Sequence, residues 1–406
     1  MAKTILMQPP APPRAAGPDL GAFLSLGFRP LYLLGVAWAV VAVVLWVFAP
    51  RWLQPPLAGV AWHAHEMLWG FIATIAVGFL MTAGANWTGL NPMPAGALVA
   101  AVALWVTARA GLLAGGDLGF VIGAAAEIAF FLLAAAALAR VVARTRNRRN
   151  YAVPLMLAAL AAADAAFLLA AWQGDHARLM HRFDAGMLVM ALIALLVARR
   201  VIPFFAMRAV AGLQIPLHER TGLAQLGAGA LAVAALLAGP GWLTAAALAV
   251  AGGLALFQTI AWRPWAVRRV PLLWILYLGY AALGAGLLVA AARTAGVELR
   301  SAVHVHLIAI AGFSVLIIGM VTRTALGHLG RPLAVDRSML ASYVCVITAA
   351  ALRLVALWPS EFSLPALHAS AVAWVVGFAL YLWRFAPWLI RPRADAAGRV
   401  TRVRPA

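Results

Sequence analysis

Cysteine is almost absent from this chain. Among its 406 residues, Cys345 is the only one. A single thiol excludes an internal disulfide and zinc or iron–sulfur sites built from two or four cysteines. It also excludes haem attached through a Cys-x-x-Cys-His motif. Any haem bound by this protein must therefore be held noncovalently.

Charged residues are scarce as well. They make up 11% of the sequence, whereas apolar residues make up 65% and the mean hydropathy is +0.94. Soluble domains are about 25% charged, so an ordinary soluble domain is excluded. Runs of roughly 20 apolar residues, the length that a helix needs to cross a bilayer, recur along the chain. Twelve are predicted, at residues 31–49, 62–84, 97–114, 118–140, 152–172, 183–206, 222–239, 242–262, 270–292, 302–322, 338–357 and 364–386.

This pattern predicts an all-α membrane protein, a polytopic bundle of about twelve transmembrane helices. The connections are short, so residues 29–388 are expected to form a single transmembrane domain. Residues 1–28 are Pro-rich and lack the apolar core and cleavage site of a signal peptide, which predicts a retained cytosolic tail. Residues 389–406 are expected to form a basic cytosolic C-terminal tail.

Acidic residues are the rarer charge, 12 against 31 basic residues, which gives a net charge of +19. The arginines lie between the predicted spans, where a bilayer and its topology explain them better than nucleic acid does. The N-terminal tail, the even-numbered loops and the C-terminus hold most of the basic residues. The positive-inside rule then places both termini in the cytosol. Spans two, six and ten consequently begin at the outer face.

Histidines gather where those three spans begin. Of nine histidines, the five at span starts are His63, His65, His181, His304 and His306. Polar groups at membrane depth are costly and usually functional. We interpret the five as metal ligands, for haem iron and copper, just inside the outer face. The alternative is a set of interfacial histidines bonded to headgroups or to loop carbonyls.

Two of these elements are His-x-His pairs, His63 with His65 and His304 with His306. An α-helix turns about 100° per residue, so the members of a pair point about 200° apart. Either the start of each span is unwound, or each member of a pair serves a separate centre. Imidazole suits both haem iron and copper.

Carboxylates accompany the outer histidines. Glu66 follows His63 by three residues, which places the two on one helical face. It is predicted to fix an imidazole tautomer, to ligate directly or to donate a proton; pairing with an interfacial basic residue is the alternative. His181 and Asp184 repeat this spacing, with Asp184 in the same candidate roles, although the surrounding loop is charged and also fits a solvated surface.

Two further acids, Glu127 and Asp164, are predicted near the middle of the bilayer. Intramembrane acids usually face a partner or a proton path. A proton relay would serve a redox enzyme or a proton-coupled transporter. A protonated acid bonded to a neighbouring helix is the alternative reading.

The opposite face carries a second group of polar residues. Arg323 and Arg331 are candidate contacts for an anionic group, either a haem propionate or a lipid phosphate. Their alternative role is the ordinary basic anchor of a span. His328 lies about 30 Å of helix rise from His306, so it does not join the outer cluster.

Eight ordered segments together resemble the NnrS family, over nearly the whole chain from residue 28 to span twelve. They are 62–67 (WHAHEM), 70–71 (GF), 78–80 (GFL), 86–89 (NWTG), 149–150 (RN), 200–205 (RVIPFF), 320–328 (MVTRTALGH) and 330–331 (GR). The resemblance implies a polytopic protein of the bacterial inner membrane that contains haem b and copper and acts in nitric oxide metabolism and nitrosative stress resistance. It maps the two His-x-His pairs and His328 onto histidine positions of the family. At the position of Asp164, the resemblance leads us to expect an amide side chain, commonly asparagine.

The expected function is binding, and in one version reduction, of nitric oxide or another diatomic ligand at a periplasmic-side centre. Reduction would make the protein a nitric oxide reductase-like oxidoreductase served by an unidentified electron donor. Its expected surroundings are membrane lipids, with no nucleic-acid partner. Two alternatives stand beside this: a proton-coupled transporter, and a factor that delivers haem or copper to another protein.

Overall fold

The computed structural model describes residues 17–216, 219–300 and 302–395. Over these ranges the ordered elements are helices, and no strand occurs in them. Twelve helices are long and apolar enough to cross a membrane, which confirms the predicted number. The tails predicted at residues 1–28 and 389–406 lie largely outside the described residues.

The spans are α2 (Phe28–Phe48), α3–η2–α4 (Gly59–Thr88), α5 (Ala95–Ala114), α6 (Gly116–Arg144), η3–α7 (Arg148–Trp172), α8 (His176–Ala209), α9 (Glu219–Ala238), α10 (Gly241–Ala261), α11 (Pro271–Thr294), α12–η5–α13 (Val303–His328), α14 (Arg337–Val355) and α15 (Ser363–Leu389). Three short elements lie between or before them: α1 (Leu20–Phe23), η1 (Pro50–Trp52) and η4 (Pro264–Val267). Several helices are longer than predicted, because an apolar run marks only the part that lipid would surround. Helix α8, for example, continues through polar residues at its start.

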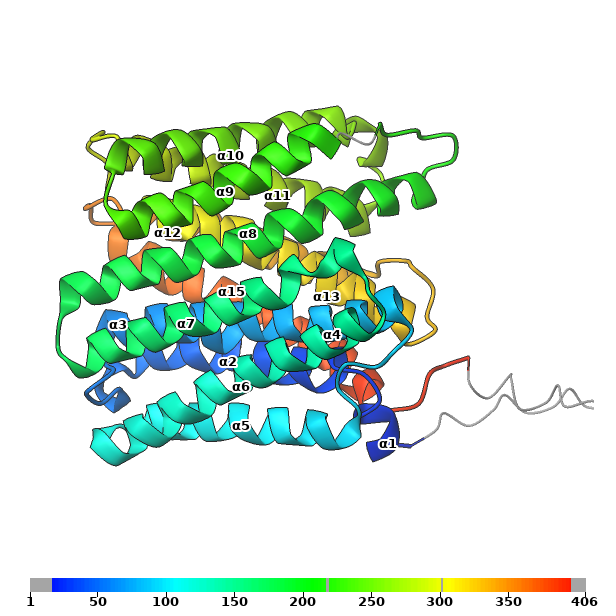
Figure 1. Cartoon of the computed structure of the whole chain (residues 1–406), viewed down its shortest axis with the longest axis horizontal. Helices are drawn as coiled ribbons and strands as arrows, with labels where there is room; N and C mark the ends of the chain where they lie inside the picture. The colour runs from blue at the N-terminus through cyan, green and yellow to red at the C-terminus, as the bar shows by residue number, and fades with distance from the viewer. Residues whose placement is uncertain (1–16, 217–218, 301, 396–406) are drawn as a thin grey trace, which may run out of the picture.

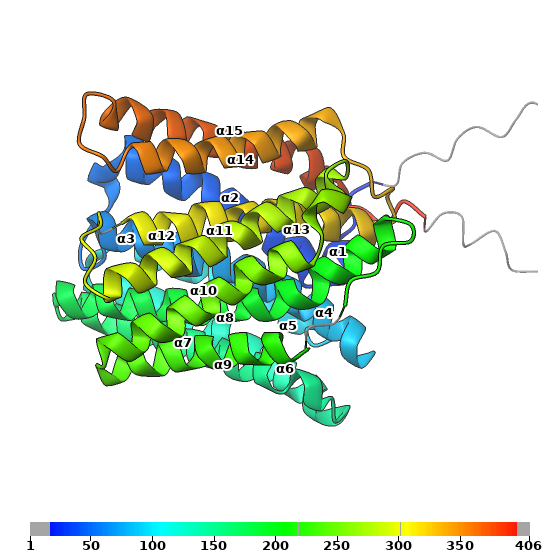
Figure 2. The ribbon, with the colours of Figure 1, turned by 90° about the horizontal axis from the view of Figure 1, so that it is seen from above.

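Consecutive helices run antiparallel and pack as hairpins, among them α5 with α6, α10 with α11, and α14 with α15. In Figure 1 the α9–α10 pair lies along one edge of the bundle and the α5–α6 pair along the opposite edge. Figure 2 shows α14 and α15 along a further edge. Helix α2 packs against α15 and α4, which joins the start of the chain to its end.

The described ends of the chain meet at one end of the bundle, as an even number of spans requires. The Asp19 amide donates to the Ile390 carbonyl at 2.8 Å. The Arg29 guanidinium donates to the carbonyls of Leu389 and Arg391 at 2.8 and 2.7 Å. Elements α3 and α12, which carry the histidine pairs, lie at the opposite end (Figure 1). The assignment of the termini to the cytosol stays a prediction from charge.

Glycine lets α5 and α6 approach closely. A Cβ on Gly111 would lie 2.6 Å from the Gly119 carbonyl oxygen and 2.8 Å from the Gly123 Cα. Small residues permit such backbone contact between membrane helices. The close approach brings Arg109 of α5 beside Glu127 of α6.

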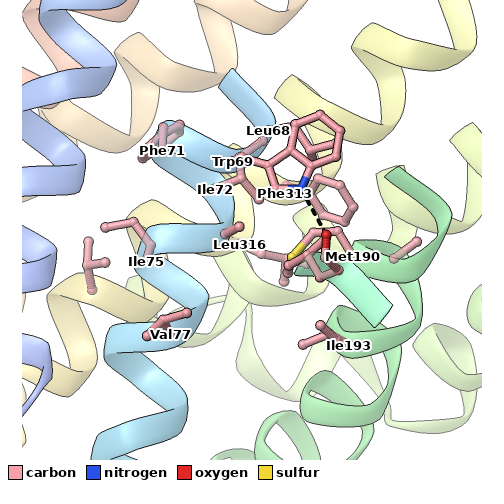
Figure 3. Close-up of a cluster of buried hydrophobic side chains, with 14 of the residues drawn as sticks. Leu68, Trp69, Phe71, Ile72, Ile75, Val77, Met190, Ile193, Phe313 and Leu316 are labelled. Atoms are coloured by element: carbon pink, nitrogen blue, oxygen red, sulfur yellow. Dashed lines mark hydrogen bonds between the residues drawn. The ribbon is translucent and has the colours of Figure 1, made fainter. Parts of the chain in front are cut away.

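An apolar core separates the two ends. Figure 3 shows Leu68 and Ile72 of η2 facing Met190 of α8, together with Phe313 and Leu316 from the tenth span. All five side chains are buried. The second, sixth and tenth spans are therefore packed together, which places the starts of these three helices around a common space.

Candidate metal centre

Both histidine pairs stand directly before a π-helical segment. His63 and His65 fall in α3 (Gly59–His65), which leads into the π-helix η2 (Glu66–Ala73). His304 and His306 fall in α12 (Val303–His306), followed by the π-helix η5 (Leu307–Ser314). π-Helical turns are rare and frequently mark functional sites. Each span therefore starts with a short α-helix that continues into a π-helix, and neither start is unwound.

A hydroxyl closes each π segment at its far end. The Thr74 hydroxyl donates to the Trp69 carbonyl at 3.1 Å, and the Ser314 hydroxyl donates to the Ala309 carbonyl at 2.8 Å. Each bond reaches five residues back along the chain, which is the spacing of a π-helical turn. The same kind of hydrogen bond thus stabilises η2 and η5, two segments that are far apart in sequence.

Glycines on the facing helices make room for the π segments. A Cβ on Gly186 of α8 would lie 2.5 Å from the Trp69 ring. A Cβ on Gly286 of α11 would lie 2.6 Å from the Ile308 side chain. Close packing at these positions fixes η2 and η5, and with them the histidines that precede each segment.

A cavity of about 460 Å³ opens between these elements, and His63, His304 and His306 line it. Pockets for small ligands and cofactors measure about 300–1,000 Å³. The walls are mostly apolar. Met67 and Phe71 of η2 contribute to them, together with side chains of α2, α8, α14 and α15. The structure thus brings three of the predicted ligands, from two distant spans, to one cavity.

His63 and His304 each keep a ring nitrogen without a partner. The His63 ring stacks on Trp46, with ring centroids 5.1 Å apart and planes at 16°. The Nδ1 atoms of His63 and His304 are buried and make no hydrogen bond with any described residue. The His304 Nε2 lies 3.8 Å from the Asp184 Oδ1. Unpaired buried nitrogens are costly, so each of these two atoms needs an explanation.

His306 has both ring nitrogens engaged. Its Nδ1–H donates to the Ala302 carbonyl at 2.8 Å, and its Nε2 accepts from the Arg353 Nε at 3.1 Å. The ring is therefore neutral, with its proton on Nδ1. His306 can ligate a metal through Nε2 only if the Arg353 side chain moves away.

His65 faces away from the cavity into the opposite part of the bundle. Its side chain is fully buried, with Nδ1 3.0 Å from the Glu66 Oε1 and Nε2 3.0 Å from the Asp164 Oδ1. The two members of the first pair therefore face different parts of the bundle, whereas His304 and His306 both line the cavity. The division of each pair between two metal centres stays a prediction.

Glu66 accompanies His65 and not His63, so the prediction of a face shared with His63 is wrong. The Glu66 Oε1 lies 3.0 Å from the His65 Nδ1, and this contact holds the carboxylate on the side turned away from the cavity. The Glu66 Oε2 accepts from the Trp38 Nε1 at 2.5 Å and from an Arg109 Nη1. Of the two predicted proton-handling acids, Asp184 alone lines the cavity.

Arg109 lies within the third predicted span and faces the interior of the bundle. The side chain is 4% exposed and lies between Glu66 and Glu127, with an Nη atom directed at each. Ligand atoms of His65, Glu127 and Asp164 lie within 4.8 Å of one another. A lone arginine inside an apolar run was the sequence signal for this cluster.

Two histidines of the sixth span occupy other positions. His181 points toward α9, where its Nε2 lies 3.1 Å from the Leu236 carbonyl oxygen, within hydrogen-bonding distance. His176 is exposed, as expected for a solvated loop, and stands at the rim of the cavity. The structure therefore keeps His181 apart from the other outer histidines.

The remaining predicted residues lie at the end opposite the cavity. His328 closes α13 there, next to the first span. The guanidinium of Arg323 lies 3.9 Å from the centre of the Phe205 ring, and that of Arg331 lies 3.6 Å from a Trp388 ring. These cation–π contacts hold both arginines far from the cavity histidines.

Two of the family-like segments, residues 149–150 and 200–205, contact each other at the end of the bundle opposite the cavity. The Arg200 guanidinium donates to the Asn150 side-chain oxygen at 2.6 Å and to the Arg149 carbonyl at 3.0 Å. The contacts tie α8 to the short helix η3 (Arg148–Asn150). Both segments thus have a structural role, which is to hold α8 against η3.

Comparison with protein families gives one match: a family model described as "NnrS protein" covers residues 22–393. This stretch contains all twelve spans. A search of curated proteins found no match.

Proposed function

The chain belongs to the NnrS family, and from that premise we propose that it binds nitric oxide at a haem–copper centre in the histidine-lined cavity. One observation carries the proposal. His63 and His304 come from different spans, line the same cavity, and each have a buried Nδ1 without a partner among the described residues. Imidazoles from separate helices of a bundle could hold the haem iron between them.

The cavity suits haem b in three respects. Its apolar walls match the macrocycle, and its volume of about 460 Å³ lies within the range of cofactor pockets. Arg293 and Arg353 stand at its edge, where guanidinium groups can bind anionic propionates. The lone cysteine, Cys345, requires noncovalent attachment. Copper also accepts imidazole and would take it from His306, another histidine of the cavity, once the Arg353 side chain moves away.

The bound metals would supply reversible binding of diatomic ligands and one-electron chemistry. The residues of the chain do the rest. His63 and His304 would provide nitrogens, and the negative charge of Asp184, 3.8 Å from the His304 Nε2, would favour a proton on that nitrogen. The mostly apolar walls would favour an apolar gas. An external electron donor would turn binding into reduction.

The proposed location is the bacterial inner membrane, with the cavity toward the periplasm and both termini in the cytosol. The twelve spans and the distribution of arginine support this placement.

The test is absorption spectroscopy and metal analysis of the purified full-length protein and four variants. Wild type should show a Soret band that shifts with nitric oxide. His63→Ala and His304→Ala should lose haem while remaining folded. His306→Ala should change the spectrum less, because its Nε2 is engaged by Arg353. His181→Ala is the matched control, since it lies at the same end and outside the cavity.

Other outcomes point to the alternatives. Wild type without haem, or unchanged spectra in His63→Ala and His304→Ala, would end the proposal. Coupled uptake of a solute and protons into vesicles, without haem, would support a transporter. Substoichiometric haem or copper that passes to an acceptor protein, with no nitric oxide consumption in the presence of an electron donor, would support a delivery factor.

A further inference from the structure

A buried cluster of charged residues lies on the face of α3 that is turned away from the cavity. It consists of His65, Glu66, Arg109, Glu127 and Asp164, all at most 4% exposed. The residues come from the second, third, fourth and fifth spans. The cavity side chains are drawn from other faces and helices, so the cluster is a separate feature of the bundle.

The cluster has more negative than positive charge. Three carboxylates stand against one guanidinium, which leaves a net charge of −2 when His65 is neutral. Uncompensated charge is strongly unfavourable in a buried, low-dielectric place. Neutrality therefore requires either one divalent cation or two protons.

Two oxygens of the cluster have no partner. The Asp164 Oδ2 and the Glu127 Oε1 are buried and make no hydrogen bond within the described part of the chain. Asp164 is fully buried and Glu127 is 1% exposed. Buried carboxylate oxygens in native proteins normally have a partner, so each of these needs an explanation.

The same residues converge on one point. The His65 ring offers a nitrogen, and Glu127 and Asp164 each offer an oxygen, with these three atoms within 4.8 Å of one another. Three protein ligands are the number found in zinc sites with an open coordination position. We infer that His65, Glu127 and Asp164 form a second metal site, apart from the cavity, that takes a divalent cation preferring nitrogen and oxygen ligands, such as Zn²⁺ or Mn²⁺.

The surroundings of His65 support this role. With Nε2 directed at the ion, the Nδ1–H would donate to the Glu66 Oε1, 3.0 Å away. Glu66 is held in turn by Trp38 and Arg109. Carboxylates placed in this way fix the tautomer of metal-binding histidines and raise their basicity. A ligand set without sulfur favours Zn²⁺, Mn²⁺ or Fe²⁺ over Cu⁺.

The bound cation would join three helices. His65 belongs to α3, Glu127 to α6 and Asp164 to α7. Because His63 lies two residues before His65 on the short helix α3, the cation would also hold the wall of the cavity that carries His63.

The experiment uses the full-length protein in detergent, treated with a chelator and then titrated with Mn²⁺, with free Mn²⁺ measured by electron paramagnetic resonance. Wild type should bind one Mn²⁺ per chain, and Zn²⁺ should displace it. Asp164→Asn and Glu127→Gln should weaken binding roughly tenfold or more, since changes even outside the ligand shell cost 10–100-fold. Asp117→Asn, an exposed carboxylate at the start of the helix that carries Glu127, is the matched control and should bind as wild type does.

Further readouts separate this site from the proposed haem centre. His63→Ala should keep the Mn²⁺ site even if it loses haem, and the cation should raise the thermal unfolding midpoint of wild type but not of Asp164→Asn. Wild type that binds neither Mn²⁺ nor Zn²⁺ would overturn the inference. So would infrared bands of protonated carboxyl groups that disappear in Asp164→Asn and Glu127→Gln without any bound metal, because two protons would then neutralise the cluster.

Discussion

Replacement of Arg109 with glutamine should destabilise the bundle severely. The side chain is 4% exposed, and its guanidinium contacts Glu66 and Glu127. Its removal leaves three buried carboxylates with no cationic side chain except a protonated His65. Loss of one partner from a buried ion pair costs about 3–5 kcal/mol. We expect the free energy of unfolding to fall by about that amount.

Replacement of Glu127 with glutamine should behave differently in chelator-treated protein. The change removes one anion from a cluster that is net negative, keeps the side-chain volume and loses one contact to Arg109. Its expected cost is about 1 kcal/mol or less, the contribution of an ordinary hydrogen bond. The double variant, which carries both Arg109→Gln and Glu127→Gln, should be more stable than Arg109→Gln alone. The coupling free energy between the two substitutions should be roughly 0.5–3 kcal/mol.

The measurement is reversible unfolding in mixed micelles, followed by the helical circular dichroism signal as denaturing detergent is added. The four proteins of the cycle are compared after chelator treatment, so that metal binding does not contribute. Equal costs for Arg109→Gln and Glu127→Gln, or an Arg109→Gln protein as stable as wild type, would refute the charge count on which the reasoning depends.

Two further predictions concern packing beside the histidines. Gly186→Ala should lower the free energy of unfolding by about 1–3 kcal/mol, because the new Cβ would lie 2.5 Å from the rigid Trp69 ring. Gly253→Ala is the control, since nothing lies within 4 Å of its Cβ, and it should not destabilise the protein. Equal losses of stability in the two variants would contradict this prediction. Trp46→Leu removes the ring stacked on His63 and should speed haem loss to apomyoglobin by at most roughly tenfold. An unchanged rate of haem transfer would show that the stacking does not support the ligand.

Much of the architecture followed from the sequence alone. Twelve apolar runs of sufficient length predicted twelve spanning helices, because crossing a bilayer is a requirement of length and composition that each segment meets by itself. The distribution of arginine predicted that the second and tenth spans begin at the same face of the membrane. Consistent with this, His63, His304 and His306 line one cavity. The ends of the helices were less accurate, since polar residues continue them beyond the apolar run.

Only the tertiary structure decided which way each polar side chain faces. Contacts with Trp38 and Arg109 hold the Glu66 carboxylate away from the cavity, and the close approach of α5 and α6 buries Arg109 beside Glu127. Arg353, from the eleventh span, occupies the free nitrogen of His306. These outcomes depend on contacts between helices distant in sequence, and a periodicity measured along one segment contains no information about the helix that packs against it.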